Sequence, residues 1–128
     1  MSMNYTDIFV YGTLRKGFHN HSLLMNSEYL GTAKTACKYV MFSRGIPFVS
    51  RTLKHTQIIG EIYRVSDAVL KSVDSLESYY PDSPDQSWYH RTEIDLINNE
   101  GILTRAFIYF NDKESGRVIT SGDYLDNH

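Results

Sequence analysis

Residues 8–17 read Ile-Phe-Val-Tyr-Gly-Thr-Leu-Arg-Lys-Gly. The first four are apolar and predict a short buried strand, which stops at Gly12. A glycine can adopt backbone angles closed to other residues and lets a ligand approach the main chain closely. Such a strand end can aim the consecutive N–H groups of Gly12, Thr13 and Leu14 at an anion or a carbonyl oxygen. An ordinary glycine turn gives the same pattern, so a second element has to decide between the two interpretations.

Length and composition predict one folded domain over residues 1–128. The chain has 128 residues, which is enough for a single core. Hydrophobic residues make up 41% and charged residues 22%, which argues against disorder. The formal net charge is -2, and no basic run is longer than Arg15-Lys16. A general nucleic-acid-binding surface is therefore not supported.

Cysteine usage and hydropathy indicate the cellular compartment. Cys37 is the only cysteine, which excludes an internal disulfide and a cysteine-rich metal site. We expect it to be a small core residue. The first residues, Met-Ser-Met-Asn-Tyr, lack the pattern of a signal peptide, and no apolar stretch is long enough to span a bilayer. These features predict a soluble cytoplasmic protein without a membrane partner.

Most of the chain is expected to form strands. Short strands are expected at residues 7–11, 29–39, 40–42, 46–49 and 57–65, with a hairpin at 92–110 that turns at 98–101. A short helix is expected at residues 20–25, and turn residues at 79–87 indicate an exposed loop. Gly60 predicts a bulge or a sharp bend in its strand.

One longer helix is expected from Ser66 to about Leu76. Ser66 suits the N-cap, and Asp67 suits the positive end of the helix dipole. Val69, Val73 and Leu76 recur at helical spacing and predict one face packed on the sheet. One such helix among six or more strands indicates the α+β class, as a small mixed β-barrel with one or two flanking helices.

Glu77 is the most informative charged residue, because it follows this helix directly. A carboxylate at a helix carboxyl end is unfavourable, since the terminus already carries partial negative charge. That penalty, together with burial, would raise the pKa of Glu77 above its reference of about 4.3. A raised pKa is what a carboxylate needs to exchange protons near neutral pH. A solvated glutamate at a frayed helix end is the alternative interpretation.

Other polar residues carry weaker signals. His19 and His21 are spaced like metal ligands, but the remaining histidines lie in unrelated segments and no carboxylate completes the motif, so no metal site is expected. Glu61 either lines a cavity or has a paired structural role. Asp74 is expected to face solvent or cap locally, and Tyr109 to be a core residue.

Five segments, taken together, resemble the gamma-glutamylcyclotransferase superfamily in order along the chain. Residues 8–17 resemble its Tyr-Gly-Thr-Leu signature, and residues 60–65 its central Gly-Glu-aliphatic-Tyr strand. Residues 73–79 are similar to its Leu-Asp-x-Leu-Glu-Gly-Tyr segment. Residues 89–91 are similar to its Tyr-x-Arg, and residues 121–124 to its closing Ser-Gly-Asp-aromatic element. The threonine of the first motif is more similar to the gamma-glutamylamine cyclotransferase-like branch than to the glutathione-degrading branch.

The resemblance implies a compact barrel whose cavity is shared by the first loop and the glutamate. It implies ring closure of a gamma-glutamyl amine or related compound to 5-oxoproline, with release of the free amine and without a cofactor. Glu77 is implied as the catalytic acid and base, and Tyr11, Gly12, Thr13 and Leu14 as the substrate-binding residues. The partner is then a small-molecule gamma-glutamyl substrate.

Four questions stay open at the level of sequence. A non-catalytic binding or regulatory protein could use the same fold and cavity, because fold does not determine activity. The identity of the released amine and the oligomeric state are also undetermined. The family commonly has glycine after the glutamate, whereas this chain has Ser78, and serine suits that position unless a positive φ is needed.

Overall fold

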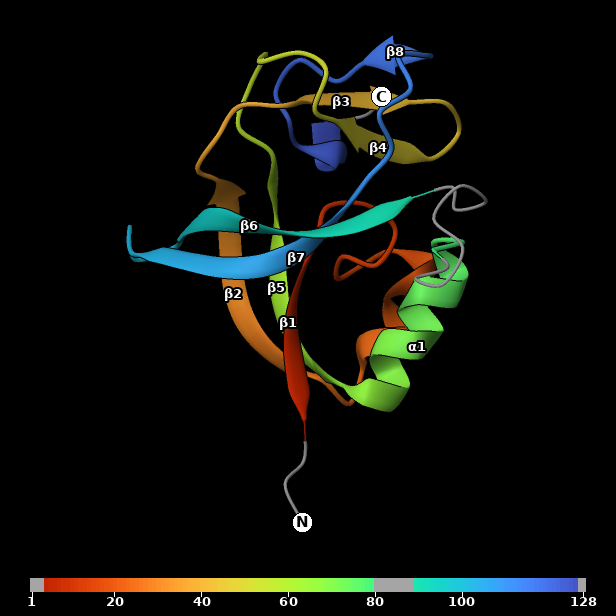
Figure 1. Cartoon of the computed structure of the whole chain (residues 1–128), viewed down its shortest axis with the longest axis vertical. Helices are drawn as coiled ribbons and strands as arrows, with labels where there is room; N and C mark the ends of the chain where they lie inside the picture. Colours follow the sequence, from red (N-terminus) through yellow and green to blue (C-terminus); the bar gives the residue numbers. More distant parts are fainter. Residues whose placement is uncertain (1–3, 80–88, 127–128) are drawn as a thin grey trace.

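The computed structural model describes residues 4–79 and 89–126 (Figure 1). In chain order its elements are β1 (Tyr5–Val10), the 3-10 helix η1 (His19–Leu24), β2 (Glu28–Thr35), β3 (Val40–Ser43), β4 (Pro47–Ser50), β5 (Ile59–Ser66), α1 (Asp67–Leu76), β6 (His90–Asn98), β7 (Leu103–Phe110), β8 (Arg117–Val118) and the 3-10 helix η3 (Tyr124–Asp126). None of the helices in these ranges is long and apolar enough to cross a membrane.

Five of the strands close into a barrel. The sheet runs β1-β5-β2-β6-β7, and β1 then pairs with β7 in parallel, Ile8 opposite Phe107. The other pairings around the barrel are antiparallel, so the barrel is mixed. Strands β4, β3 and β8 extend the sheet beyond β7 and lie together at the upper end in Figure 1. The predicted α+β class and mixed barrel are confirmed.

Burial on both faces explains why β1 is an apolar run. Phe9 packs in the core cluster that includes Leu96 and Ile108 of the barrel strands. Its neighbours Ile8 and Val10 face the other way, into a second cluster that includes Val73 of α1. Alternate residues of a strand point to opposite faces, so the barrel core and the layer beneath α1 both need apolar residues here. The same strand carries the signature loop at its end.

The main helix begins and ends where its sequence predicts. Ser66 caps it, and its hydroxyl oxygen accepts a hydrogen bond from the Val69 N–H at 3.3 Å. The buried residues of α1 are Val73 and Asp74, whereas Leu76 keeps 40% of its surface exposed. The packed face is therefore rotated from the expected one, toward Asp74. In Figure 1, α1 lies beside the barrel, below the β3–β4–β8 extension.

Several local expectations need correction. The short helix expected at 20–25 is present as the 3-10 helix η1, but Met25, its C-cap residue, is 72% exposed and supplies no core contact, whereas Leu24 is buried. Cys37 is exposed and is not a core residue. Gly60 was expected to mark a bulge or a sharp bend, but it pairs in register with Ala33, and the register shift in this pair of strands lies between Tyr29 and Gly31. The predicted loop at 79–87 falls, after Tyr79, outside the described residues.

Gly60 has a different role, which is to let two strands approach. A Cβ atom there would lie 2.4 Å from the Val10 carbonyl oxygen and 2.7 Å from the Phe9 ring. No side chain fits in that space, because real Cβ contacts of this length do not occur. Gly60 thus allows β5 to pack tightly against the end of β1, where the signature loop begins.

Candidate functional site

A buried ion pair fixes the loop that follows β1. Residues 12–15 form a turn in which the Arg15 N–H donates to the Gly12 carbonyl at 3.0 Å. The Arg15 side chain is buried, with Nη1 2.7 Å from Asp123 Oδ1 and Nε 3.4 Å from Glu61 Oε2. A charge this buried is stable only when it is paired. Arg15 therefore ties the loop both to β5 and to the segment near the carboxyl end.

Glu61 completes this anchor and takes the structural role left open by the sequence. Its Oε1 accepts hydrogen bonds from the Lys16 N–H at 2.9 Å and from the Tyr63 hydroxyl at 2.8 Å. Each carboxylate oxygen thus has a described partner, so Glu61 acts as part of the framework that holds the loop.

Asn20 and His21, on the 3-10 helix η1, contact the loop. Asn20 donates its backbone N–H to the Thr13 carbonyl at 3.1 Å and its side-chain amide to the Thr13 hydroxyl at 2.9 Å. The His21 Nδ1 lies 3.0 Å from the Leu14 carbonyl oxygen. Within residues 4–79 and 89–126, no group of three or more histidine, cysteine or carboxylate residues could hold a metal ion. These contacts hold the far side of the loop.

The loop keeps three N–H groups without a described acceptor. No residue in the described ranges accepts a hydrogen bond from the backbone N–H of Gly12, Thr13 or Leu14. Buried or partly buried N–H groups normally find partners, so such groups are available to an oxygen of a ligand. The three residues that carry them all line the same cavity.

Gly12 is needed for space, not for unusual backbone angles. It is not among the glycines with positive φ. A Cβ atom at this position would lie 2.5 Å from Cγ of Pro47, the first residue of β4. The space beside Gly12 that was expected to admit a ligand is thus occupied by the Pro47 ring. This close approach brings β4 against the loop, where the start of β4 forms one wall of the cavity.

The cavity has a volume of about 360 Å³. Its walls are the end of β1 with the loop after it, Asn20, the start of β4, the carboxyl end of α1, and the rings of Tyr89 and Tyr109. Tyr11, Gly12, Thr13, Leu14 and Glu77 all line it, so the structure brings the expected catalytic residue and the four expected binding residues to one cavity. A space of this size accommodates a small molecule.

Glu77 is the C-cap residue of α1 and is half-buried at this cavity. Its backbone N–H donates to the Val73 carbonyl at 2.9 Å, which fixes the position of the Glu77 Cα atom at the end of the helix. Burial, and secondly the negative charge of Asp74, raise the pKa of Glu77 from 4.5 to about 7. A carboxyl group with that pKa is present in both protonation states near neutral pH, so it can accept and donate protons.

The expectation that Asp74 faces solvent or caps locally is wrong. Asp74 is 8% exposed, and its Oδ1 accepts a hydrogen bond of 2.5 Å from the Tyr109 hydroxyl. Its Oδ2 lies 3.5 Å from Nη2 of Arg91 on β6. Both partners come from strands distant in sequence, so helical periodicity alone gave no signal. Tyr109, expected as a core residue, is buried and also lines the cavity.

Two tyrosine hydroxyls brace the rest of the wall. Tyr11 donates to the Tyr109 carbonyl at 2.7 Å, and Tyr89 donates to the Pro47 carbonyl at 2.9 Å. Burial raises the pKa of Tyr11 well above its usual value, and the nearby Tyr89 and Glu77 raise it further. Tyr11 therefore stays protonated, and its hydroxyl holds β7 beside the signature loop.

Ser78 occupies the position where a positive φ is needed. Its φ is 51°, and among the described residues it is the one non-glycine with a positive value. Non-glycine residues in this region carry steric strain. The positive φ explains why the family usually has glycine at this position, whereas this chain has a serine there in spite of the strain. Ser78 lines the cavity beside Glu77.

The barrel thus holds a cavity lined both by a carboxyl group whose pKa is raised to about 7 and by a loop whose N–H groups have no described acceptor. Comparisons with known proteins show the family to which such a chain belongs. Residues 8–126 match the family described as gamma-glutamyl cyclotransferase, AIG2-like. The chain belongs to this family.

Individual relatives match over most of the chain. A candidate gamma-glutamylcyclotransferase of Methanocaldococcus jannaschii is 41% identical over 120 residues, covering 93% of this chain and 95% of the relative. The gamma-L-glutamyl-butirosin B gamma-glutamyl cyclotransferase of Niallia circulans is 29% identical over 107 residues, covering 83% of this chain and 68% of that protein. The crystal structure of an AIG2-like protein from Mus musculus matches with a TM-score of 0.73 at 27% identity, covering 88% and 80% of the two chains.

Proposed function

We propose that this protein converts a gamma-glutamyl amine or related gamma-glutamyl compound to 5-oxoproline, releasing the free amine, with Glu77 as general acid and base. Family membership supports a cyclotransferase of this type. The observation that carries the specific proposal is the carboxyl group of Glu77, whose pKa of about 7 coincides with its place on the cavity. Tyr11, Gly12, Thr13 and Leu14 are proposed as the residues that bind the substrate.

The proposed reaction is an internal displacement. The α-amine of the gamma-glutamyl group attacks the carbon of its own side-chain amide, and the five-membered ring closes as the C–N bond to the leaving amine breaks. The α-amine is mostly protonated at neutral pH, with a reference pKa of about 7.7–8.0. A base has to remove a proton from it, and the leaving nitrogen has to receive one. Glu77 can do both in turn, because its pKa lies close to that of the amine.

Holding the substrate in a folded conformation contributes further to the rate acceleration. The attacking nitrogen and the amide carbon belong to one molecule, so the cavity has only to exclude extended conformers. The tyrosine rings of the wall are held by hydrogen bonds of 2.5–2.9 Å, which makes the cavity rigid enough to select a conformer.

The loop is proposed to bind negative charge. The N–H groups of Gly12, Thr13 and Leu14 can donate to the α-carboxylate of the substrate or to the oxyanion that develops during ring closure. Losing one donor of the second kind typically costs about 2.7–4 kcal/mol of activation free energy. The buried Arg15 supports this role indirectly, because its contacts with Glu61 and Asp123 hold the loop in place. The displacement itself requires no redox step, so we propose that it proceeds without a cofactor.

The experiment is a panel of gamma-glutamyl compounds assayed for 5-oxoproline. The panel contains gamma-glutamyl alkylamines, gamma-glutamyl-ε-lysine, gamma-glutamyl amino acids and larger conjugates. We expect release of 5-oxoproline and of the free amine in equal amounts from at least one member. Ligand-induced rises in Tm without release from any member would contradict the proposal and would indicate a binding protein.

A further inference from the structure

A second carboxylate lies directly behind the site, and the proposed reaction assigns it no role. Asp74 and Glu77 are three residues apart around the end of α1, so their side chains occupy neighbouring positions on one face of the helix. Two carboxylates placed close together, with one of them 8% exposed, disfavour each other's ionised form. Such an arrangement therefore calls for a functional explanation. A solvent-facing position was available for Asp74 on the same helix, as the exposed Asp67 shows.

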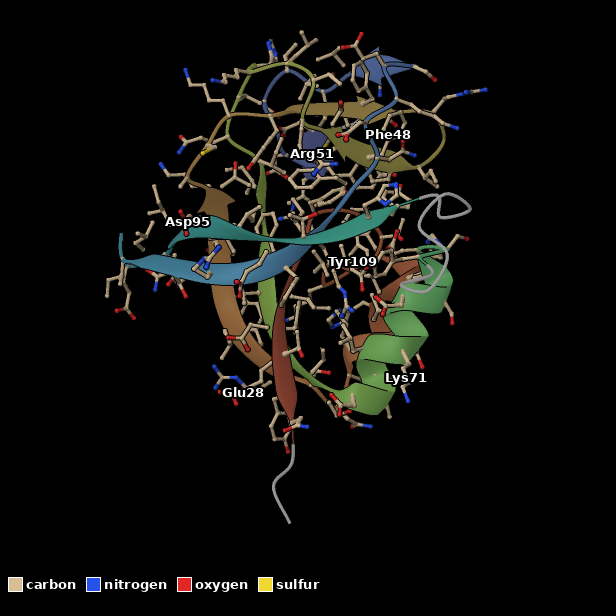
Figure 2. All side chains as sticks on the ribbon, in the orientation of Figure 1. Glu28, Phe48, Arg51, Lys71, Asp95 and Tyr109 are labelled. Carbon is tan, nitrogen blue, oxygen red and sulfur yellow. The ribbon has the colours of Figure 1, made fainter. Side chains whose placement is uncertain are left out.

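We propose that Asp74 is a positioning residue for Glu77. Its carboxylate accepts a hydrogen bond from Tyr109 and lies beside Arg91, and these contacts fix the Tyr109 ring in the cavity wall. The same carboxylate keeps a permanent negative charge behind the glutamate. The inference about catalysis rests on the proposed function, whereas the inference about charge concerns the folded protein alone. Figure 2 labels Tyr109, whose hydroxyl bridges from β7 to α1, on the side of the barrel that faces this helix.

The contacts indicate that Asp74 carries the charge and Tyr109 the proton. A separation of 2.5 Å between Tyr109 Oη and Asp74 Oδ1 is typical of a hydroxyl that donates to an ionised carboxylate. Burial raises the pKa of Asp74, and the hydrogen bond from Tyr109 and the charge of Arg91 oppose that rise. Burial and the adjacent Asp74 raise the pKa of Tyr109 far above the neutral range, so its hydroxyl remains a donor.

Arg91 secures this arrangement without reaching the cavity itself. Its guanidinium carbon lies 5.4 Å from the centre of the Tyr79 ring and 5.5 Å from that of Phe107, and its Nη2 is 3.5 Å from Asp74 Oδ2. It is absent from the cavity lining, so it stabilises Asp74 rather than a ligand. Among residues 4–79 and 89–126, the titratable groups placed against the two carboxylates are Arg91 on β6, Tyr109 on β7, and the neutral hydroxyl of Tyr11, which follows β1 directly.

The two carboxyl groups therefore have different roles. Asp74 is ionised and fully engaged, whereas Glu77 exchanges protons. A fixed negative charge nearby makes Glu77 a stronger base, because it disfavours the ionised form of the glutamate. Removing that charge while keeping the shape of Asp74 should lower the pH at which Glu77 titrates.

The test is a titration of Glu77 by carbon NMR of the side-chain carboxyl groups in protein labelled at glutamate. The Glu77 signal is identified by its loss in E77Q. D74N keeps an oxygen that accepts from Tyr109 but removes the charge, and we expect the Glu77 midpoint to fall by about one pH unit. D67N is the matched control, because it makes the same change in the exposed first turn of the same helix, and its midpoint should equal that of the wild type.

An unchanged Glu77 midpoint in folded D74N would overturn the proposal. If D74N does not fold, the double variant D74L with Y109F replaces the carboxylate and its donor together, and the same fall is expected. Failure of both variants to fold would also overturn it, because Asp74 would then be a purely structural residue.

The activity assay separates this inference from the proposed function. With a substrate that the wild type accepts, the acidic limb of kcat/KM for D74N should move to lower pH by the same amount as the NMR midpoint. A wild type that releases no 5-oxoproline would defeat the proposed function but leave the titration result intact. A shifted NMR midpoint with an unshifted acidic limb would show that Asp74 tunes Glu77 without affecting catalysis, and would overturn the catalytic part.

Discussion

Replacing Glu77 with glutamine should stabilise the fold, and the gain should depend on pH. The pKa of Glu77 is raised in the folded state, so the native protein binds a proton there more tightly than the unfolded chain does. Stability contributed by this proton is fully present below pH 4.5 and is lost as pH rises to about 7. Glutamine is neutral throughout, so E77Q does not lose it. The two proteins should therefore have similar stability near pH 4.5 and diverge above it.

The size of the divergence follows from the pKa values. A rise from 4.5 to about 7 corresponds to about 3 kcal/mol in the free energy of unfolding at pH 8.5. Water in the cavity screens part of this energy because Glu77 is only half-buried, so we expect a measured gain of about 1–3 kcal/mol.

The assay is urea denaturation followed by circular dichroism at pH 4.5, 6, 7 and 8.5 at one ionic strength. E100Q is the control, because Glu100 is exposed in the turn between β6 and β7, and its profile should run parallel to that of the wild type. A profile for E77Q that also runs parallel to the wild type would refute the burial and the raised pKa on which the site rests.

Three further predictions concern the framework and the loop. Gly60→Ala should destabilise the protein by about 3 kcal/mol, seen as a lower urea midpoint, because its Cβ would lie 2.4 Å from the Val10 carbonyl oxygen; an unchanged midpoint would contradict the close approach of β5 and β1. Ser78→Gly should stabilise it by about 0.5–1 kcal/mol, because relief of strain at a φ of 51° outweighs the greater freedom of glycine in the unfolded chain; a loss of stability would mean that the serine side chain contributes more than the strain costs. Crystals soaked in formate, acetate or sulfate should show an oxyanion bound to the N–H groups of Gly12, Thr13 and Leu14, and water alone at that place would count against the anion-binding role.

The parts of the fold that depend on neighbours in sequence were predictable. The hairpin with its turn at 98–101 has the expected pairing between β6 and β7. The N-cap at Ser66 and the buried run of β1 also follow from local rules. Strand alternation and capping are determined within a few residues, so one sequence carries enough information to locate them.

The parts that depend on distant partners were not predictable. Periodicity placed Leu76 on the packed face of α1 and Asp74 in solvent, but the partners that bury Asp74 come from β6 and β7. The barrel itself was predicted, but the parallel pairing of β1 with β7 that closes it joins segments about a hundred residues apart, so no local pattern indicated that pairing. Motif order along the chain grouped Glu77 with residues 11–14, and all of them line one cavity. The motif at residues 73–79 also contains Asp74, but it did not indicate that this carboxylate is buried behind the cavity wall.

The central claim, that Glu77 transfers the protons of ring closure, is tested most directly by the rate of 5-oxoproline formation in E77Q. Glutamine keeps the size and hydrogen-bonding shape of the side chain but cannot accept a proton at neutral pH. With a substrate that the wild type accepts, and with circular dichroism showing a folded variant, the rate should fall by about 10²–10⁴-fold or more, the usual worth of general acid–base catalysis. Equal rates in E77Q and the wild type would remove Glu77 from the mechanism.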